Sequence, residues 1–170
     1  MRRIVLGILI ILSHQVFSAV SVGTKVPDFQ LLDQDGKSFS IQSRKDKGWT
    51  VLFFYPKAGT PGCTKQVCAF RDSIKAIKEL GAETYGISSD SVAVQSKFHQ
   101  EHKLQFTLLA DPELKAINLF GVKMLGIDLA KRWTFIIDPK LILRSIDDKV
   151  DPVMDPTHVT QKLKALQTAP

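Results

Sequence analysis

Residues 49–63 join a buried strand to a helix through a short turn. Residues 49–55, Trp-Thr-Val-Leu-Phe-Phe-Tyr, form a near-continuous apolar and aromatic run, which is typical of a central strand covered on both faces. Pro56 ends this run, Thr60 is a natural N-cap, and Pro61 is a natural first residue of a helix. The junction therefore predicts a sheet in which a central strand leads directly into a helix.

The rest of the chain alternates between strand and helix patterns. Ser89-Asp90 is expected to cap a helix that turns Val94 and Phe98 inward. Further strands are expected over residues 29–32, 39–41, 84–87, 106–109, 132–137 and 141–146, and further helices over 111–120 and 156–166. This order, closed by a hairpin and a helix, predicts an α/β protein with a central mixed β-sheet flanked by helices. The thioredoxin-like fold has this arrangement.

The two cysteines of the chain lie in the first turns of the helix expected over residues 61–80. Cys63 heads the inward stripe that continues through Val67, Phe70, Ile74 and Ile77, whereas Cys68 lies roughly 140° around the helix axis from Cys63. Unpaired N–H groups and the helix dipole favour an anion in the first turn. Since the thiolate is the reactive form of cysteine, the sequence predicts a reactive, partly enclosed Cys63 and a peripheral Cys68.

A permanent disulfide between the two cysteines does not fit a regular helix. Residues five apart have Cα atoms roughly 8.7 Å apart, while a disulfide needs about 4.4–6.8 Å. The pair therefore predicts a transient redox couple that forms only when the helix unwinds. The spacing is not Cys-x-x-Cys, so dithiol exchange is not favoured. His99 and His102 are expected on a solvated helix face, so a metal site is not favoured either.

A reactive thiolate at neutral pH needs a fixed cation. Lowering the pKa of a thiol from about 8.5 to about 6 requires about 3.4 kcal/mol, whereas a helix terminus supplies about 0.3–1 kcal/mol. Lys57 and Lys65 are expected on the surface, and Arg71 lies more than two turns along the helix. From the residues alone, two roles stay open for Arg132. It is either a surface cation at a strand end or the cation that pairs with the Cys63 sulfur.

The first 18 residues have the pattern of a signal peptide. Arg2 and Arg3 precede an apolar run of nine residues, which spans about 14 Å as a helix against a hydrocarbon core of about 30 Å. We therefore expect export to a bacterial periplasm, with an inner-membrane anchor facing the periplasm as the alternative. The formal net charge of +6 is scattered without a basic run, which does not favour nucleic-acid binding.

Several motifs resemble one family of redox enzymes. Residues 56–63 read Pro-Lys-Ala-Gly-Thr-Pro-Gly-Cys and match a P-x-x-x-T-x-x-C signature, and a second cysteine follows five residues later. Residues 106–111 and 132–138 match as well. From about residue 22 onward the sequence resembles the peroxiredoxins of the Q type, also called the bacterioferritin comigratory protein group. The resemblance implies a thioredoxin-like peroxiredoxin domain over residues 19–170 and an atypical two-cysteine thiol peroxidase.

The resemblance implies a role for each matching residue. Cys63 would be the peroxidatic cysteine and form a sulfenic acid, which Cys68 would resolve as an intramolecular disulfide. Thr60 would hydrogen-bond the thiolate and the peroxide, and Pro56 would shield the sulfur from solvent. Arg132 would stabilise the thiolate and the transition state, which decides the alternative left open above. No metal, haem, flavin or other cofactor is implied.

We therefore expect a thiol-dependent peroxidase that reduces hydrogen peroxide and organic hydroperoxides. A reduced thioredoxin or thioredoxin-like dithiol protein would regenerate it, and a resolving cysteine within the same chain suits a monomer. Two alternatives belong to other classes. An exported thioredoxin-fold disulfide oxidoreductase is disfavoured by the missing Cys-x-x-Cys, and a non-catalytic binding module is disfavoured by the complete set of Thr60, Cys63, Cys68 and Arg132.

Overall fold

The computed structural model describes residues 20–168, so the signal peptide predicted over residues 1–18 lies outside the described part. The described chain forms a seven-stranded mixed sheet in the order β2-β1-β5-β4-β3-β6-β7. Its elements are β1 (Gln30–Asp33), β2 (Ser38–Ser40), the short 3-10 helix η1 (Ile41–Arg44), β3 (Trp49–Phe54), α1 (Pro61–Glu79), β4 (Ala82–Ser88), α2 (Val92–Glu101), β5 (Thr107–Ala110), α3 (Lys115–Leu119), β6 (Thr134–Ile137), β7 (Leu143–Asp147) and α4 (Asp155–Thr168). The predicted α/β class with a central mixed sheet is confirmed.

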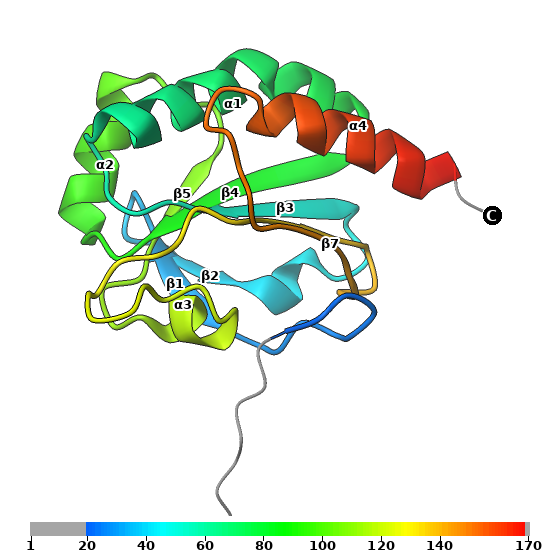
Figure 1. Ribbon diagram of the computed structural model, residues 1–170, viewed down its shortest axis with the longest axis horizontal. Helices are drawn as coiled ribbons and strands as arrows, with labels where there is room; N and C mark the ends of the chain where they lie inside the picture. Colours follow the sequence, from blue (N-terminus) through cyan, green and yellow to red (C-terminus); the bar gives the residue numbers. More distant parts are fainter. Residues whose placement is uncertain (1–19, 169–170) are drawn as a thin grey trace, which may run out of the picture.

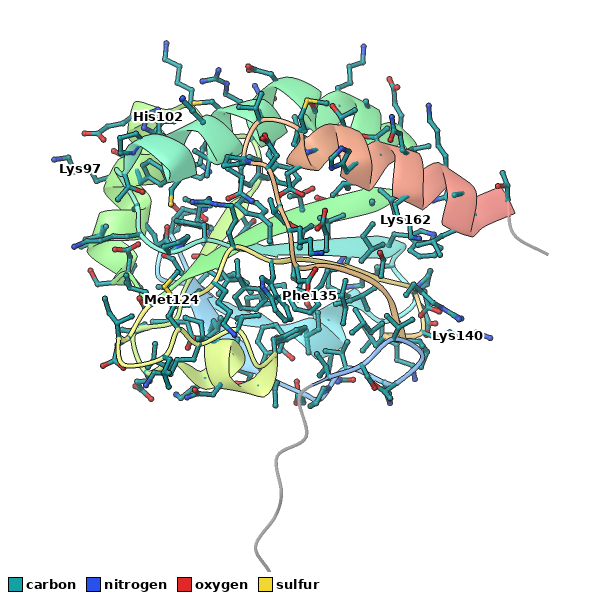
Figure 2. All side chains as sticks on the ribbon, viewed as in Figure 1. Lys97, His102, Met124, Phe135, Lys140 and Lys162 are labelled. Atoms are coloured by element: carbon teal, nitrogen blue, oxygen red, sulfur yellow. The ribbon has the colours of Figure 1, made fainter. Side chains whose placement is uncertain are left out.

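The sheet is covered on both faces. Helices α1, α2 and α4 lie on one side and α3 on the other (Figure 1). Strand β3 pairs parallel with β4 and antiparallel with β6, so it lies well inside the sheet. Phe135 of β6 packs in the layer between the sheet and α3 (Figure 2). Both faces of the sheet therefore contribute a hydrophobic core.

Strand β3 and helix α1 form the unit that carries the cysteines. Side chains alternate along a strand, so Val51, Phe53 and Tyr55 pack toward α1, whereas Leu52 and Phe54 pack toward α3. The rings of Phe53 and Phe70 stack with centroids 4.4 Å apart, which fixes α1 on β3. The prediction of a central strand covered on both faces is confirmed.

Helix α1 closely matches the prediction. It runs from Pro61 to Glu79 with Leu80 as its C-cap, and its buried residues include the whole predicted inward stripe. The described part of α1 is continuous through both cysteines, and neither cysteine is in a disulfide. The reduced pair therefore lies in an intact helix.

Helix α2 differs from the prediction in its start and its inward face. Its N-cap is Ser91, whose hydroxyl accepts from the N–H of Val94, and its buried residues are Gln95 and Phe98. Val94 is 43% exposed, so its predicted inward position is wrong. The apolar pattern misled because a polar side chain, Gln95, takes the buried place and is satisfied there by hydrogen bonds.

Two further boundaries shift for local reasons. Helix α3 begins at Lys115 rather than near residue 111, because the Asp111 carboxylate accepts hydrogen bonds from the N–H groups of Lys115 and Ile117. Strand β6 begins at Thr134. Arg132 therefore precedes the strand rather than starting it, and this position leaves its side chain free to point toward α1.

Candidate active site

The turn between β3 and α1 positions Cys63. Two hydrogen bonds hold the backbone of this turn. The N–H of Tyr55 donates to the carbonyl of Ile87 in β4, and the N–H of Ala58 donates to Asp90 Oδ2, in the loop after β4, at 2.8 Å. Gly59 adopts a φ of +77°, a conformation that glycine takes without strain. The turn therefore delivers the start of α1 to a fixed place at the end of the sheet.

Cys63 is fully buried at the N-terminal end of α1. The first helical hydrogen bond runs from the N–H of Thr64 to the carbonyl of Thr60 at 2.9 Å, so the N–H groups just before it have no helical partner. These groups and the helix dipole create positive potential where the sulfur lies. Burial alone favours the neutral thiol, so the site needs additional positive charge.

Arg132 supplies that charge. Its Nη2 donates to Cys63 Sγ at 3.4 Å, and its Nη1 donates to Gln66 Oε1 at 2.5 Å. A Cβ on Gly62 would lie 3.4 Å from Nη2, so the guanidinium lies directly beside the first turn of α1. The structure thus brings together the two residues that the resemblance paired, although they are far apart in the sequence.

Two polar residues that no sequence motif marks lie behind Arg132. Gln66 and Asp155 are both buried, and Gln66 Nε2 donates to Asp155 Oδ2 at 2.6 Å. Burial raises the pKa of Asp155 to about 6, although hydrogen bonds from Gln66 and Thr134 act in the opposite direction. Gln66 could have been suspected because it lies three residues after Cys63, on the same helix face. Nothing in the sequence connects Asp155 with this site.

Thr60 and Pro56 lie in the turn that precedes Cys63. The hydroxyl of Thr60 donates to the carbonyl of Lys57 at 3.0 Å, and its side chain makes no capping hydrogen bond even though Thr60 is the N-cap. Thr60 must therefore rotate its hydroxyl before it can donate to a sulfur or a peroxide. Pro56 is half-buried directly after β3. The roles of both residues remain predictions.

Cys68 lies half-buried on a different side of α1, next to α2. Its Sγ is 3.9 Å from His102 Nδ1, and the His102 ring packs edge-on against Phe98. His102 lies at the end of α2 (Figure 2). His99 Nε2 is 3.1 Å from the carbonyl oxygen of Phe106. Both histidines are half-buried rather than fully solvated, because His99 lies against β5 and His102 lies against Cys68 of α1.

The described residues contain no group of three or more His, Cys, Asp or Glu side chains placed to hold a metal ion. The site itself brings together a thiol, an arginine and the start of a helix. Such a site is suited to nucleophilic attack by sulfur on an electrophilic atom whose leaving group departs as an anion.

Residues 22–146 match the AhpC/TSA family. The chain is a peroxiredoxin of this family. Chloroplastic peroxiredoxin Q from Populus jackii is 39% identical over 158 residues, which cover 91% of this chain and 72% of that protein. Its counterpart from Triticum aestivum is 42% identical over 155 residues, covering 89% and 69%. These similarities confirm the resemblance to the Q type that the motifs indicated.

Solved peroxiredoxin structures have the same fold. Peroxidoxin BcpB from Mycobacterium tuberculosis shares 37% identity at a TM-score of 0.79, covering 85% of this chain and 97% of that one. The bacterioferritin comigratory protein of Xanthomonas campestris shares 26% at a TM-score of 0.76, covering 81% and 91%. The thioredoxin-like peroxiredoxin fold is thereby confirmed. The protein is a thiol-dependent peroxidase with two cysteines, and the disulfide oxidoreductase and binding-module alternatives are set aside.

The comparisons correct the predicted location. The peroxiredoxin Q relatives are chloroplast proteins, which overturns both the assignment to a bacterial periplasm and its inner-membrane variant. A charged start followed by a short apolar run does not specify a compartment, so this pattern alone was not enough to predict a periplasmic location. Among residues 20–168, no helix is both long and apolar enough to cross a bilayer.

Proposed function

We propose that this peroxiredoxin reduces hydrogen peroxide and organic hydroperoxides with Cys63 as the attacking residue. The observation that carries the proposal is the 3.4 Å contact between Arg132 Nη2 and Cys63 Sγ at the start of α1. The guanidinium and the free N–H groups of the first turn favour the thiolate, which is the nucleophilic form. They also favour the negative charge that develops on the leaving oxygen.

The first step is a displacement at oxygen. The Cys63 thiolate attacks one peroxide oxygen, the O–O bond breaks, and the other oxygen leaves and takes up a proton as water or an alcohol. Sulfur is oxidised by two electrons to the sulfenic acid, and the peroxide is reduced by two. Thr60, after its hydroxyl turns away from the Lys57 carbonyl, and Arg132 would orient the peroxide. Pro56 would keep bulk water from the sulfur.

The second step joins the two cysteines. The Cys68 thiolate attacks the sulfenic sulfur of Cys63, an S–S bond forms, and the hydroxyl leaves as water after protonation. Since a regular helix keeps these Cα atoms roughly 8.7 Å apart, the first turns of α1 unwind for this step. A reduced thioredoxin or thioredoxin-like dithiol protein then returns two electrons and two protons by thiol–disulfide exchange. No second subunit is needed, which supports a monomer.

Peroxide consumption with dithiothreitol by wild type, Cys63→Ser and Cys68→Ser tests the assignment. We expect no turnover with Cys63→Ser. With Cys68→Ser we expect a single fast oxidation followed by slow recycling through external thiol. Turnover by Cys63→Ser at the wild-type rate would refute the role of Cys63. Mass spectrometry of peroxide-treated wild type should show a Cys63–Cys68 linked peptide, and its absence would refute the role of Cys68.

The reductant and the oligomeric state need separate measurements. Thioredoxin, glutaredoxin and glutathione should be compared at equal electron equivalents, and we expect thioredoxin to support the fastest turnover. Sedimentation of the reduced and oxidised protein should give the mass of one chain. A stable dimer in either state would contradict the proposed monomer.

A further inference from the structure

A continuous line of hydrogen bonds connects Cys63 with the start of α4. Arg132 Nη2 donates to Cys63 Sγ at 3.4 Å, and Arg132 Nη1 donates to Gln66 Oε1 at 2.5 Å. Gln66 Nε2 in turn donates to Asp155 Oδ2 at 2.6 Å. Helices α1 and α4 pack side by side on the same face of the sheet (Figure 1), which allows a residue of α4 to reach behind the site.

The direction of these bonds is set by Asp155. A guanidinium has only donors, so it binds Gln66 only where the amide presents oxygen. An ionised carboxylate only accepts, so it binds Gln66 only where the amide presents nitrogen. The two ends of the amide therefore face Arg132 and Asp155 in one orientation, which is the orientation observed. A buried amide that lost either partner would be free to turn over.

The carboxylate is itself held in place. Thr134 Oγ1 donates to the same oxygen, Asp155 Oδ2, at 2.9 Å, and Asp155 is 1% exposed. Its other oxygen, Oδ1, is buried and accepts no hydrogen bond from the described residues. A half-satisfied buried carboxylate destabilises the fold. The one oxygen that is satisfied is the one bonded to Gln66.

We propose that Asp155 is a positioning residue that holds Arg132 against the Cys63 sulfur through the amide of Gln66. This inference rests on the proposed role of Cys63. Asp155 does not touch the sulfur and is not a catalytic residue. Its effect on the rate passes through the orientation of Gln66, as supporting residues act behind a direct contact.

Protonation of Asp155 should release Arg132. The neutral acid carries a hydroxyl that can donate to Gln66 Oε1, so the amide can turn and present its nitrogen to the guanidinium. Donor would then face donor, and Arg132 would lose one of its two anchors. Burial raises the pKa of Asp155 to about 6, so this change occurs in mildly acidic solution.

The other groups around Asp155 are few. Two of them, Gln66 of α1 and Thr134 of β6, donate hydrogen bonds to the Asp155 carboxylate. The other two are the ionisable groups Asp147 of β7 and His158 of α4. The nearby charge of Asp147 raises the pKa of Asp155, and that of His158 lowers it. Asp147, His158 and Lys162 also line a groove of about 450 Å³ that borders Asp155. A pH study must therefore compare the Asp155 variants with wild type at each pH.

Three variants in the Cys68→Ser background test the proposal, since only Cys63 then reacts with peroxide. Asp155→Leu removes the acceptor, Asp155→Asn removes the charge but keeps one acceptor, and Gln66→Met breaks the connection. We expect Asp155→Leu to slow oxidation of Cys63 about tenfold, as is typical when a supporting residue is lost. The thiolate absorbance at neutral pH should fall with it. Asp155→Asn should recover part of the rate.

The double variant and the pH profile separate positioning from general damage. Asp155→Leu combined with Gln66→Met should be no slower than Gln66→Met alone, because both changes break the same connection. The ratio of wild-type to Asp155→Asn rates should fall below pH 6, where wild type also loses the carboxylate. Additive losses, or a ratio that does not change with pH, would overturn the proposal.

A buried aspartate elsewhere provides the matched control. Asp111 is fully buried on the other face of the sheet and accepts hydrogen bonds from N–H groups at the start of α3, so Asp111→Asn should leave the Cys63 rate unchanged. If Asp155→Leu does not fold, the comparison of Asp155→Asn with Asp111→Asn decides the question alone. Inactive Cys63→Ser together with wild-type rates in every Asp155 variant would refute this inference only. Active Cys63→Ser would refute the proposed function itself.

Discussion

Cys68 Sγ lies 3.9 Å from Nδ1 of His102, across the contact between α1 and α2. The proposed resolving step requires a thiolate at Cys68, and an imidazole nitrogen at this distance is placed to accept the thiol proton before the helix unwinds. Arg71 Nη1 donates to the His102 carbonyl at 3.1 Å, which fixes the end of α2 beside Cys68. This contact therefore gives the proposed second step a candidate base that lies outside the matched motifs.

Replacing His102 should slow disulfide formation without affecting peroxide attack. Because general-base assistance contributes about 10²–10⁴-fold at ideal geometry and this contact is long, we expect His102→Ala to slow resolution about tenfold. The sulfenic acid would persist, and more Cys63 would be oxidised to sulfinic acid at high peroxide. Stopped-flow tryptophan fluorescence and intact mass measure the two effects.

The control for this prediction is His99→Ala. His99 lies on the same helix, but its Nε2 contacts the carbonyl of Phe106 rather than Cys68. It should leave the resolving rate within about twofold of wild type, as expected for a change that leaves the pair intact. Equal resolving rates in wild type and His102→Ala would contradict the role of the imidazole.

Arg132→Lys should slow peroxide attack strongly even though the charge is kept. A guanidinium donates to the sulfur and to Gln66 from two nitrogens at once, whereas an ammonium is a single point. We expect a loss of about 100-fold in the rate constant for Cys63 oxidation, comparable to removal of one donor to a developing anion. Lys131→Ala, which changes the neighbouring cation over Trp133, serves as the control in competition assays with horseradish peroxidase.

Oxidation should unwind the start of α1 and leave its remainder folded. The disulfide needs Cα atoms about 4.4–6.8 Å apart, less than a regular helix allows five residues along. Amide hydrogens of residues 64–68 should exchange faster in the oxidised protein, whereas those of residues 74–79, anchored by Ile74 and Ile77 in the core, should stay protected. Hydrogen exchange with mass spectrometry measures both segments, and unchanged exchange over residues 64–68 would rule out the unwinding.

The Asp155 carboxylate should reduce stability near neutral pH. Burial raises its pKa from 3.8 to about 6, so between these values the folded protein binds a proton that the unfolded chain has released. Stability contributed by this group is therefore full below pH 3.8 and is lost as pH rises to about 6. The loss is about 3 kcal/mol.

Asp155→Asn should remove this dependence, because the amide stays neutral at every pH. Urea unfolding of the reduced proteins should show the variant more stable than wild type above pH 6, while its Cys63 reacts more slowly. Asp138→Asn, at a buried carboxylate that pairs with Arg144, should instead lower stability at neutral pH. A less stable Asp155→Asn at neutral pH would contradict the assigned cost of burial.

The sequence predicted the parts of the fold that follow from local patterns. An apolar run predicted the strand over residues 49–55, which is found over Trp49–Phe54. A cap and a helical period predicted the start of α1 at Pro61 and its inward stripe. The sequence-based prediction was wrong where a polar side chain occupies a buried helix position. Val94 is exposed because Gln95 takes the inward position, and hydropathy does not reveal a glutamine that tertiary hydrogen bonds satisfy.

The candidate site also has a part that the local sequence predicts and a part that only tertiary packing decides. The sequence by itself determined Cys63 at a helix start, Cys68 five residues later, and a need for positive charge near the first sulfur, because these follow from spacing and from the energetics of an anion. The family resemblance pointed to Arg132 for that need, and the structure places its guanidinium on the sulfur. Only the tertiary structure decided that Gln66 and Asp155 stand behind Arg132 and that His102 lies beside Cys68. These contacts join residues far apart in the chain, and their distances are set by how the helices pack on the sheet.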